Sequence, residues 1–112
     1  MINNDQQQTT TIVNYGIERV YYAVIKGAES ISSFTIKSAN KITYSISISV
    51  GMSFSSWGEI MNVSLLYLDE NRTKIDIRSV SKIGSLLGAN YKNRENIDKI
   101  LNAMSFYLQQ VF

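Results

Sequence analysis

The feature that most constrains this fold is a strict alternation of apolar and hydroxyl side chains over residues 42–50. Every second residue there is apolar, and those between are threonine or serine. Side chains of a β-strand point alternately to its two faces, so the pattern predicts a strand with one buried and one solvated face. Because the solvated face carries almost only hydroxyl groups, we expect the strand to lie in an antiparallel sheet that is covered on one side.

Four other stretches have the composition of β-strands. The stretch 60–68 differs from the rest because it carries apolar side chains on both faces. Turn-forming residues separate the strands, as at 39–41 and at 69–72. The five predicted strands are 9–15, 34–37, 42–50, 60–68 and 73–80.

Two segments instead repeat apolar residues at spacings of three and four, which is typical of amphipathic helices. The first begins at Ile17 and continues for about four turns. Gly27 within it is expected to let the helix lie close to the sheet. The second begins near Asn93, a good N-cap, and continues for about five turns. Its apolar stripe is formed by Ile97, Ile100, Leu101, Met104, Leu108 and Val111.

The resulting order, β-α-β4-α, predicts an α+β domain in which two helices cover one face of a five-stranded antiparallel sheet. This is the order of the TATA-box-binding-protein-like fold, also called helix-grip. A chain of 112 residues, 45% of them hydrophobic, is long enough for one core only. We expect a single domain over 9–112, preceded by a flexible tail over 1–8 that lacks any hydrophobic period.

Composition excludes several classes of function. Cysteine and histidine are both absent, so thiolate or imidazole metal sites and histidine-dependent triads are excluded, and no cofactor is expected. The net charge is only +2, and the basic residues are scattered, so neither nucleic acid nor a membrane surface is expected as a partner. The polar N-terminus does not look like a signal peptide, which favours a cytoplasmic location.

Three motifs resemble a family of small, uncharacterised bacterial proteins. They are Phe34-Thr35-Ile36-Lys37-Ser38-Ala39, then Gly51-Met52-Ser53 through Ser56-Trp57-Gly58-Glu59, and Lys92-Asn93-Arg94-Glu95-Asn96-Ile97-Asp98-Lys99-Ile100. The resemblance covers most of residues 10–110. It implies the helix-grip fold but no activity, because the family has none assigned.

The second and third motifs supply four candidate interaction residues. Trp57 and Glu59 could contact a partner from a loop, or Trp57 could close one end of the core while Glu59 accepts backbone hydrogen bonds. Arg94 could help bind an anion at the start of the last helix. Alternatively, Arg94 or Asn93 holds the preceding loop in place.

Catalytic interpretations are weaker. Ser79 and Lys82 fit an S-x-x-K pattern, but that chemistry needs the serine at the start of a helix, and this one ends a strand. Glu95 and Asp98 could form an acid-base pair, although their spacing is more typical of a solvated helix face. We therefore expect a protein that is not an enzyme.

Two hypotheses for function remain. Ile60, Leu66 and Leu68 lie on the face opposite the predicted core, and this surplus apolar surface favours a homodimer formed through the outer sheet face or a sheet edge. The alternative is a carrier of a small apolar ligand, since larger helix-grip proteins hold apolar ligands between the sheet and the C-terminal helix. Large side chains, including several tyrosines, favour a solid core in that space over a cavity.

Overall fold

The computed structural model of the chain describes residues 6–53, 57–82 and 89–110. Within these residues the order of elements is β-α-β4-α, which confirms the predicted order. The elements are β1 (Gln6–Val13), α1 (Ile17–Glu29), β2 (Phe34–Asn40), β3 (Ser45–Val50), β4 (Glu59–Asp69), β5 (Arg72–Ser81) and α2 (Ala89–Leu108).

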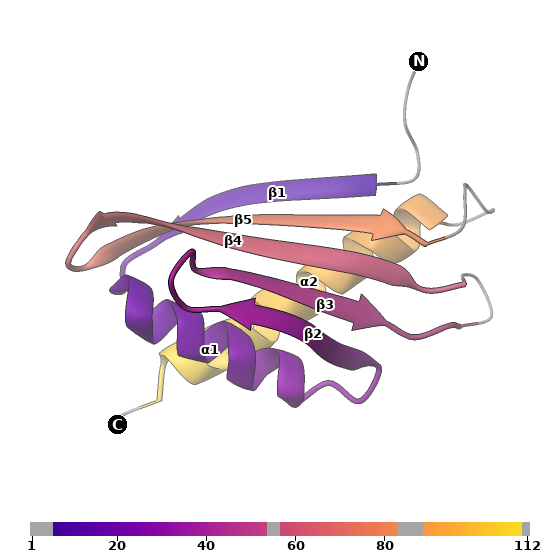
Figure 1. The fold of residues 1–112 in the computed structure, drawn as a ribbon, viewed down its shortest axis with the longest axis horizontal. Coiled ribbons are helices and arrows are strands. Elements are labelled where there is room, and N and C mark those ends of the chain that lie inside the picture. The colour runs from indigo at the N-terminus through magenta and orange to yellow at the C-terminus, as the bar shows by residue number, and fades with distance from the viewer. Residues whose placement is uncertain (1–5, 54–56, 83–88, 111–112) are drawn as a thin grey trace, which may run out of the picture.

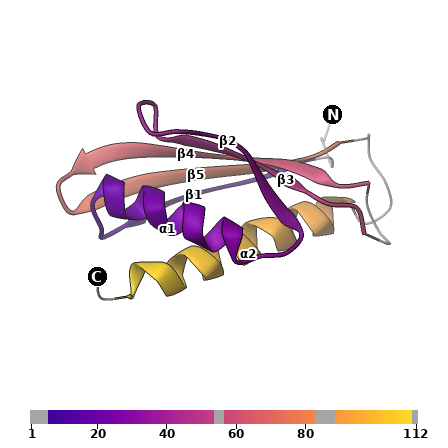
Figure 2. The same cartoon turned by 60° about the horizontal axis from the view of Figure 1, so that its bottom comes forward.

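The strands form one antiparallel sheet in the order β1-β5-β4-β3-β2. The first strand of the chain pairs with the last, so β1 and β2 are the two edges. Both helices lie on the same face of the sheet and cross each other there (Figures 1 and 2). Of the two, α2 contacts chiefly β1 and β5, whereas α1 contacts chiefly β2 and β4. This is the predicted sheet covered on one face by two helices.

The core lies between the sheet and the two helices. Alternate residues of the three central strands point toward the helices and are buried, as the period of two requires. The helical stripes meet them from the other side. The inward residues of the sheet core are Ile46, Ile48, Val50, Met61, Val63, Leu65, Ile75 and Ile77, and those of α2 are Ile97, Ile100, Met104 and Leu108.

The strand predicted over 42–50 is shorter than its alternating pattern suggests. β3 begins at Ser45, and Ile42 lies in the preceding turn with 92% of its surface exposed. The Asn40 side-chain oxygen accepts hydrogen bonds from the backbone N–H groups of Ile42 and Thr43, at 2.9 and 3.2 Å. An asparagine that bonds backbone groups two and three residues ahead stabilises a turn, and here it overrides the alternation.

The first strand begins earlier than predicted. β1 starts at Gln6, so residues 6–8 of the predicted tail are part of the sheet, and residues 1–5 lie outside the described residues. The glutamines are held by β5: Gln8 Nε2 donates to Asp76 at 2.8 Å, and Gln6 Oε1 accepts from Arg78. Hydrogen bonds between neighbouring strands therefore order a stretch that lacks an apolar period.

The last helix also begins earlier than predicted, at Ala89 instead of near Asn93. Asn93 is therefore a buried residue inside α2 and not its N-cap.

Gly27 was predicted to let α1 lie close to the sheet, and this prediction was wrong about the neighbouring element. A Cβ built on Gly27 would come within 3.0 Å of the Met104 backbone nitrogen, so this glycine lets α1 approach α2, not the sheet.

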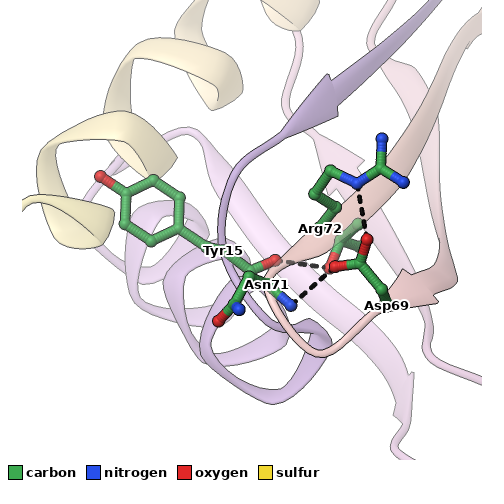
Figure 3. Close-up of polar contacts among 5 residues, drawn as sticks. Tyr15, Asp69, Asn71 and Arg72 are labelled. Atoms are coloured by element: carbon green, nitrogen blue, oxygen red, sulfur yellow. Dashed lines mark hydrogen bonds and ion pairs between the residues drawn. The ribbon is translucent and has the colours of Figure 1, made fainter.

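The corner between β1 and α1 packs on the β4–β5 hairpin (Figure 3). Asp69 accepts hydrogen bonds from the Asn71 backbone N–H at 2.9 Å and from Arg72 Nε at 2.7 Å, which closes the predicted hairpin turn. The Arg72 hydrogen bond, with that of Asn71, lowers the pKa of Asp69. A Cβ on Gly16 would lie 2.7 Å from the Glu70 carbonyl oxygen, so only glycine fits this corner without a shift.

Candidate functional site

The inner face of the sheet changes from apolar to polar toward the end where β4 begins. Cross-strand pairing defines successive rows of inward side chains on β3, β4 and β5. Along this direction, one row is wholly apolar, the next contains one serine, and the last contains a carboxylate and a serine. In order, these rows are Ile46-Val63-Ile77, Ile48-Met61-Ser79 and Val50-Glu59-Ser81.

Glu59 is the centre of this polar end. It is the first residue of β4, and its side chain points inward with none of its surface exposed. One carboxylate oxygen, Oε1, accepts a hydrogen bond of 2.5 Å from the side-chain amide of Asn96, which is fully buried on α2. No ion pair within the described part of the chain includes Glu59.

The pair leaves two acceptors without a donor. Within the described residues, neither Glu59 Oε2 nor Asn96 Oδ1 has a hydrogen-bond partner, and both atoms are buried. A buried polar atom without a partner typically costs about 1–3 kcal/mol, and more when it carries charge. Turning the Asn96 amide over would place its oxygen against Glu59 Oε1, so the amide has the orientation in which it donates to the carboxyl group.

The neighbouring polar residues satisfy one another. Ser79 Oγ donates to Asn93 Oδ1 at 2.8 Å, and Asn93 Nδ2 donates to Ser81 Oγ at 3.2 Å. These bonds tie the first half of α2 to the end of β5. The same half of α2 thus carries a satisfied amide at Asn93 and, one turn later, a half-satisfied amide at Asn96.

The predicted interaction residues are only partly brought together. Glu59 and Asn93 both lie at this polar end, between the sheet and α2. Trp57 is 52% exposed and so does not close the core. Arg94 points away from Glu59: it donates to Thr9 Oγ1 of β1 at 2.9 Å and pairs with Asp98 at 3.0 Å. Asn93 and Arg94 therefore tie α2 to the sheet, and the loop at 83–88 that one of them was predicted to hold lies outside the described residues.

Of the predicted interface residues, Ile60 and Leu66 lie on the opposite face of the sheet, and Leu68 lies at the register shift between Tyr67 and Asp69. Leu66 is 57% exposed there, whereas Ile60 and Leu68 are half-buried. Ile60 is the second residue of β4, and Leu66 and Leu68 lie near its other end. Leu66 pairs with Lys74, which pairs in turn with Ile12, so a lysine separates the two exposed apolar side chains of this row.

Three residues were not predicted to lie at this polar end: Asn96, Ser81 and Ser79, the last of which was considered only as a catalytic serine. A signal existed for each. Asn96 follows Asn93 by three residues, which places both amides on the helix side that carries Ile97 and Ile100. Ser79 and Ser81 continue the inward alternation that begins with the isoleucines of β5.

The catalytic alternatives do not assemble. Ser79 is buried against Asn93, whereas Lys82 Nζ donates to Ser49 at 2.7 Å on the outer face, so the S-x-x-K residues do not meet. Burial alone would raise the pKa of Glu95, but the combined effect of Lys92 and Lys99 is larger. The pKa of Glu95 is therefore lower than its usual value. A general acid needs a raised pKa, so Glu95 is poorly suited to that role.

The described residues include no cluster of three carboxylates that could hold a metal ion. In the same parts of the chain, neither helix is both long and apolar enough to span a bilayer. Of the large side chains expected between sheet and helices, Phe34, Met104 and Leu108 are buried in the core, whereas Tyr67 is exposed. A groove of about 490 Å³ lies elsewhere, on the helix layer, lined by Glu18, Arg19, Tyr22, Ala23, Lys26 and Tyr107.

By sequence, the chain matches no protein-family model and no curated protein significantly. Its fold is nevertheless similar to several solved structures. A protein from Nitrosospira multiformis is 15% identical with a TM-score of 0.65, covering 94% of this chain and 97% of its own. A START superfamily protein from Mycobacterium smegmatis is 9% identical with a TM-score of 0.65, covering 96% and 99%.

A third similar structure is the di-domain aromatase/cyclase BexL of the BE-7585A biosynthetic pathway. It is 10% identical with a TM-score of 0.56, and the match covers 92% of this chain and 43% of that one. At such identities the likeness establishes the fold alone. The chain has the helix-grip fold, as predicted.

Proposed function

We propose that this domain binds a small, largely apolar molecule at the polar end of the space between the sheet and α2, and acts as a carrier. One observation supports this above all: Glu59 and Asn96 present two buried acceptors that no described residue satisfies. Native structures satisfy most buried polar groups, so an exception suggests a ligand that supplies the missing donors. The surrounding apolar rows would hold the rest of the molecule.

The fold supports the same proposal. Helix-grip folds bind small apolar ligands, and in this chain the polar end lies between the sheet and the C-terminal helix. The groups at the site are a carboxylate, two amides and two hydroxyls. Such groups orient a ligand by hydrogen bonds, and they lack the activated nucleophile or matched acid and base that bond-breaking needs.

Exposed apolar side chains are also present at this end. Met52 and Trp57 lie in the connection between β3 and β4, and Tyr91 lies in the first turn of α2. Figure 1 shows that the end of β3, the start of β4 and the start of α2 lie at the same end of the molecule. These side chains could contact the part of a ligand that extends from Glu59 toward solvent.

The proposal can be tested with the full chain and Nile red, a neutral apolar dye that fluoresces when it leaves water. We expect saturable binding of one dye per chain and loss of binding when Asn96→Trp fills the polar end. Leu66→Ser, on the outer sheet face, is the matched control and should bind normally. Absence of saturable binding, together with no co-purified small molecule in native mass spectrometry, would overturn the proposal.

Self-association is a second candidate, and the two sheet edges favour β1 as its site. Edge strand β2 is protected against pairing with another chain, because its register shifts between Ile36 and Ser38 and because Lys37 lies at that shift. β1 has eight residues, QQQTTTIV, without a charge, a proline or a register shift. We infer that a second copy of the chain pairs antiparallel with this edge.

Light scattering over a range of concentrations tests the dimer. Ile12→Lys places a charge on β1 and should give a monomer, whereas Leu66→Lys, on the outer face of the central strand β4, should leave the dimer intact. If only Leu66→Lys dissociates the protein, then the interface is the sheet face and not the edge. A protein that is monomeric at every concentration would contradict both forms.

A further inference from the structure

We propose that the ligand carries a protonated amine, and that Glu59 and Asn96 together recognise it. This inference rests on the proposed function and specifies the chemical class of the ligand: an ammonium group on an apolar body. It follows from a count of donors, acceptors and charges at the polar end of the core.

The site lacks donors and positive charge, and it does not lack acceptors. Glu59 Oε2 and Asn96 Oδ1 both need a donor, and one of them belongs to a carboxylate that no described cation balances. The nearby lysines are engaged elsewhere, since Lys82 bonds Ser49 and Lys92 pairs with Glu95. A buried charge without a partner is strongly unfavourable, so the missing partner is best supplied by a cation.

Neutral ligand groups and a trapped water match this count less well. A ligand hydroxyl has one donor, which leaves one acceptor unsatisfied and the charge unbalanced. A trapped water has two donors but no charge. A proton on Glu59 Oε2 removes the charge and is itself a donor that can pair with Asn96 Oδ1, so it is the competing state, and equal binding of the charged and neutral ligands in the test below would favour it. An ammonium group has three N–H donors and a positive charge, so it can satisfy both free acceptors and balance Glu59 at once.

The packing of the core limits where the apolar body can lie. Toward the centre of the sheet the next side chains are Met61 and Ile97, both fully buried in the filled core. The body must therefore extend the other way, past Val50 and toward the end of the sheet. Because Glu59 and Asn96 are fully buried, binding requires the first turns of α2 to separate from the start of β4 and the end of β5.

The test uses four ligands with the same octyl chain: octylammonium, octanol, octanoate and octyltrimethylammonium. Binding to the full chain is followed by two-dimensional amide NMR, which observes the Asn93 and Asn96 side chains directly. We expect octylammonium to bind at least about tenfold more tightly than the other three and to shift the Asn96 amide signals. Octyltrimethylammonium separates charge from hydrogen bonding, because it keeps the charge but has no N–H donor.

Glu59→Gln removes the charge with little change of shape and should reduce the preference for octylammonium over octanol to about threefold or less. Glu29→Gln removes an exposed carboxylate at the end of α1 and should leave the preference unchanged. Since the four-ligand series on the unaltered protein is itself decisive, a misfolded Glu59→Gln variant would not prevent the test.

The outcomes distinguish the two proposals. If none of the four ligands and no apolar dye binds, the proposed carrier function is wrong. If the ligands bind equally well, the carrier function stands and the amine inference is overturned. The inference is also overturned if octylammonium binds without shifting the Asn96 signals and is displaced by about 0.5 M sodium chloride, since screening by salt indicates pairing with surface carboxylates.

Discussion

Gly27 of α1 lies against the backbone of Met104 on α2, so closely that a Cβ on Gly27 would sit 3.0 Å from the Met104 nitrogen and 3.2 Å from the Ala103 Cβ. Because the nearest atom belongs to the backbone, it can move only if the helix moves. Gly27→Ala should therefore destabilise the domain by about 1–3 kcal/mol, although alanine is the better helix former by about 1 kcal/mol.

Urea unfolding measures this effect. Gly51→Ala is the matched control, because a Cβ there would lie 3.8 Å from the nearest atom, the Ser33 carbonyl oxygen, and should change stability little. If Gly27→Ala is instead more stable than the parent, then the two helices have room to separate and the close approach is not required.

The half-satisfied pair of Glu59 and Asn96 should reduce stability. Replacing both at once, as Glu59→Met with Asn96→Leu, removes the two unsatisfied acceptors and should stabilise the fold by about 1–3 kcal/mol in thermal or urea unfolding. Asn93→Leu is the opposite case, since it removes the acceptor of the buried Ser79 hydroxyl and should cost about 1–3 kcal/mol. A double variant that is less stable than the parent would indicate that the pair supports the fold.

Asp76 should make the attachment of β1 dependent on pH. It accepts hydrogen bonds from Gln8 and Thr10, which lower its pKa in the folded state. Because the pKa of Asp76 is lower in the folded state, its ionised form stabilises the fold at pH values above its unfolded pKa of about 3.9. This stabilisation is lost as the pH falls through the folded pKa. The stability difference between the parent and Asp76→Asn should thus be about 1 kcal/mol near pH 7 and should become smaller as the pH falls below about 4. Glu29→Gln, at an exposed site, controls for charge, and an equal difference at both pH values would contradict the assignment.

Two neighbouring residues of α2, Ile100 and Leu101, differ in burial and should therefore differ in their tolerance of a charged substitution. Ile100 is 1% exposed in the core, so Ile100→Asp should prevent folding, because it buries a charge without a partner. Leu101 is only partly buried against the core, and Leu101→Asp should leave a folded protein that is weaker by about 1–3 kcal/mol. Circular dichroism during urea unfolding distinguishes these cases, and a cooperative transition for Ile100→Asp would show that α2 is placed wrongly.

Much of the fold was predictable because its signals are local. The alternation that ends at Val50 and the helical spacing from Ile97 to Leu108 each reflect one buried face, and a buried face is visible in sequence as a period. The boundaries were less predictable. Ile42 continues the alternation but is exposed, because the Asn40 side chain closes a turn before it.

The candidate site was only partly predictable. Glu59 and Asn93 were selected from two motifs that stand far apart in the chain, but nothing local indicated that both lie at one end of the core. Asn96 was missed because an amide on an apolar stripe has no period of its own. Trp57 was expected to close the core or to meet a partner, and its exposure removes the first of these interpretations.

The sequence by itself determined the α+β class, the order of elements and the inward face of each central strand, since these depend on the spacing of apolar residues along a short stretch. Only the tertiary structure decided that β1 pairs with β5, that Gly27 meets α2 and that Glu59 meets Asn96. Those contacts join residues that are distant in the chain, and they form only when the whole core packs. The partner of a buried carboxylate is therefore a property of the folded domain and not of any motif.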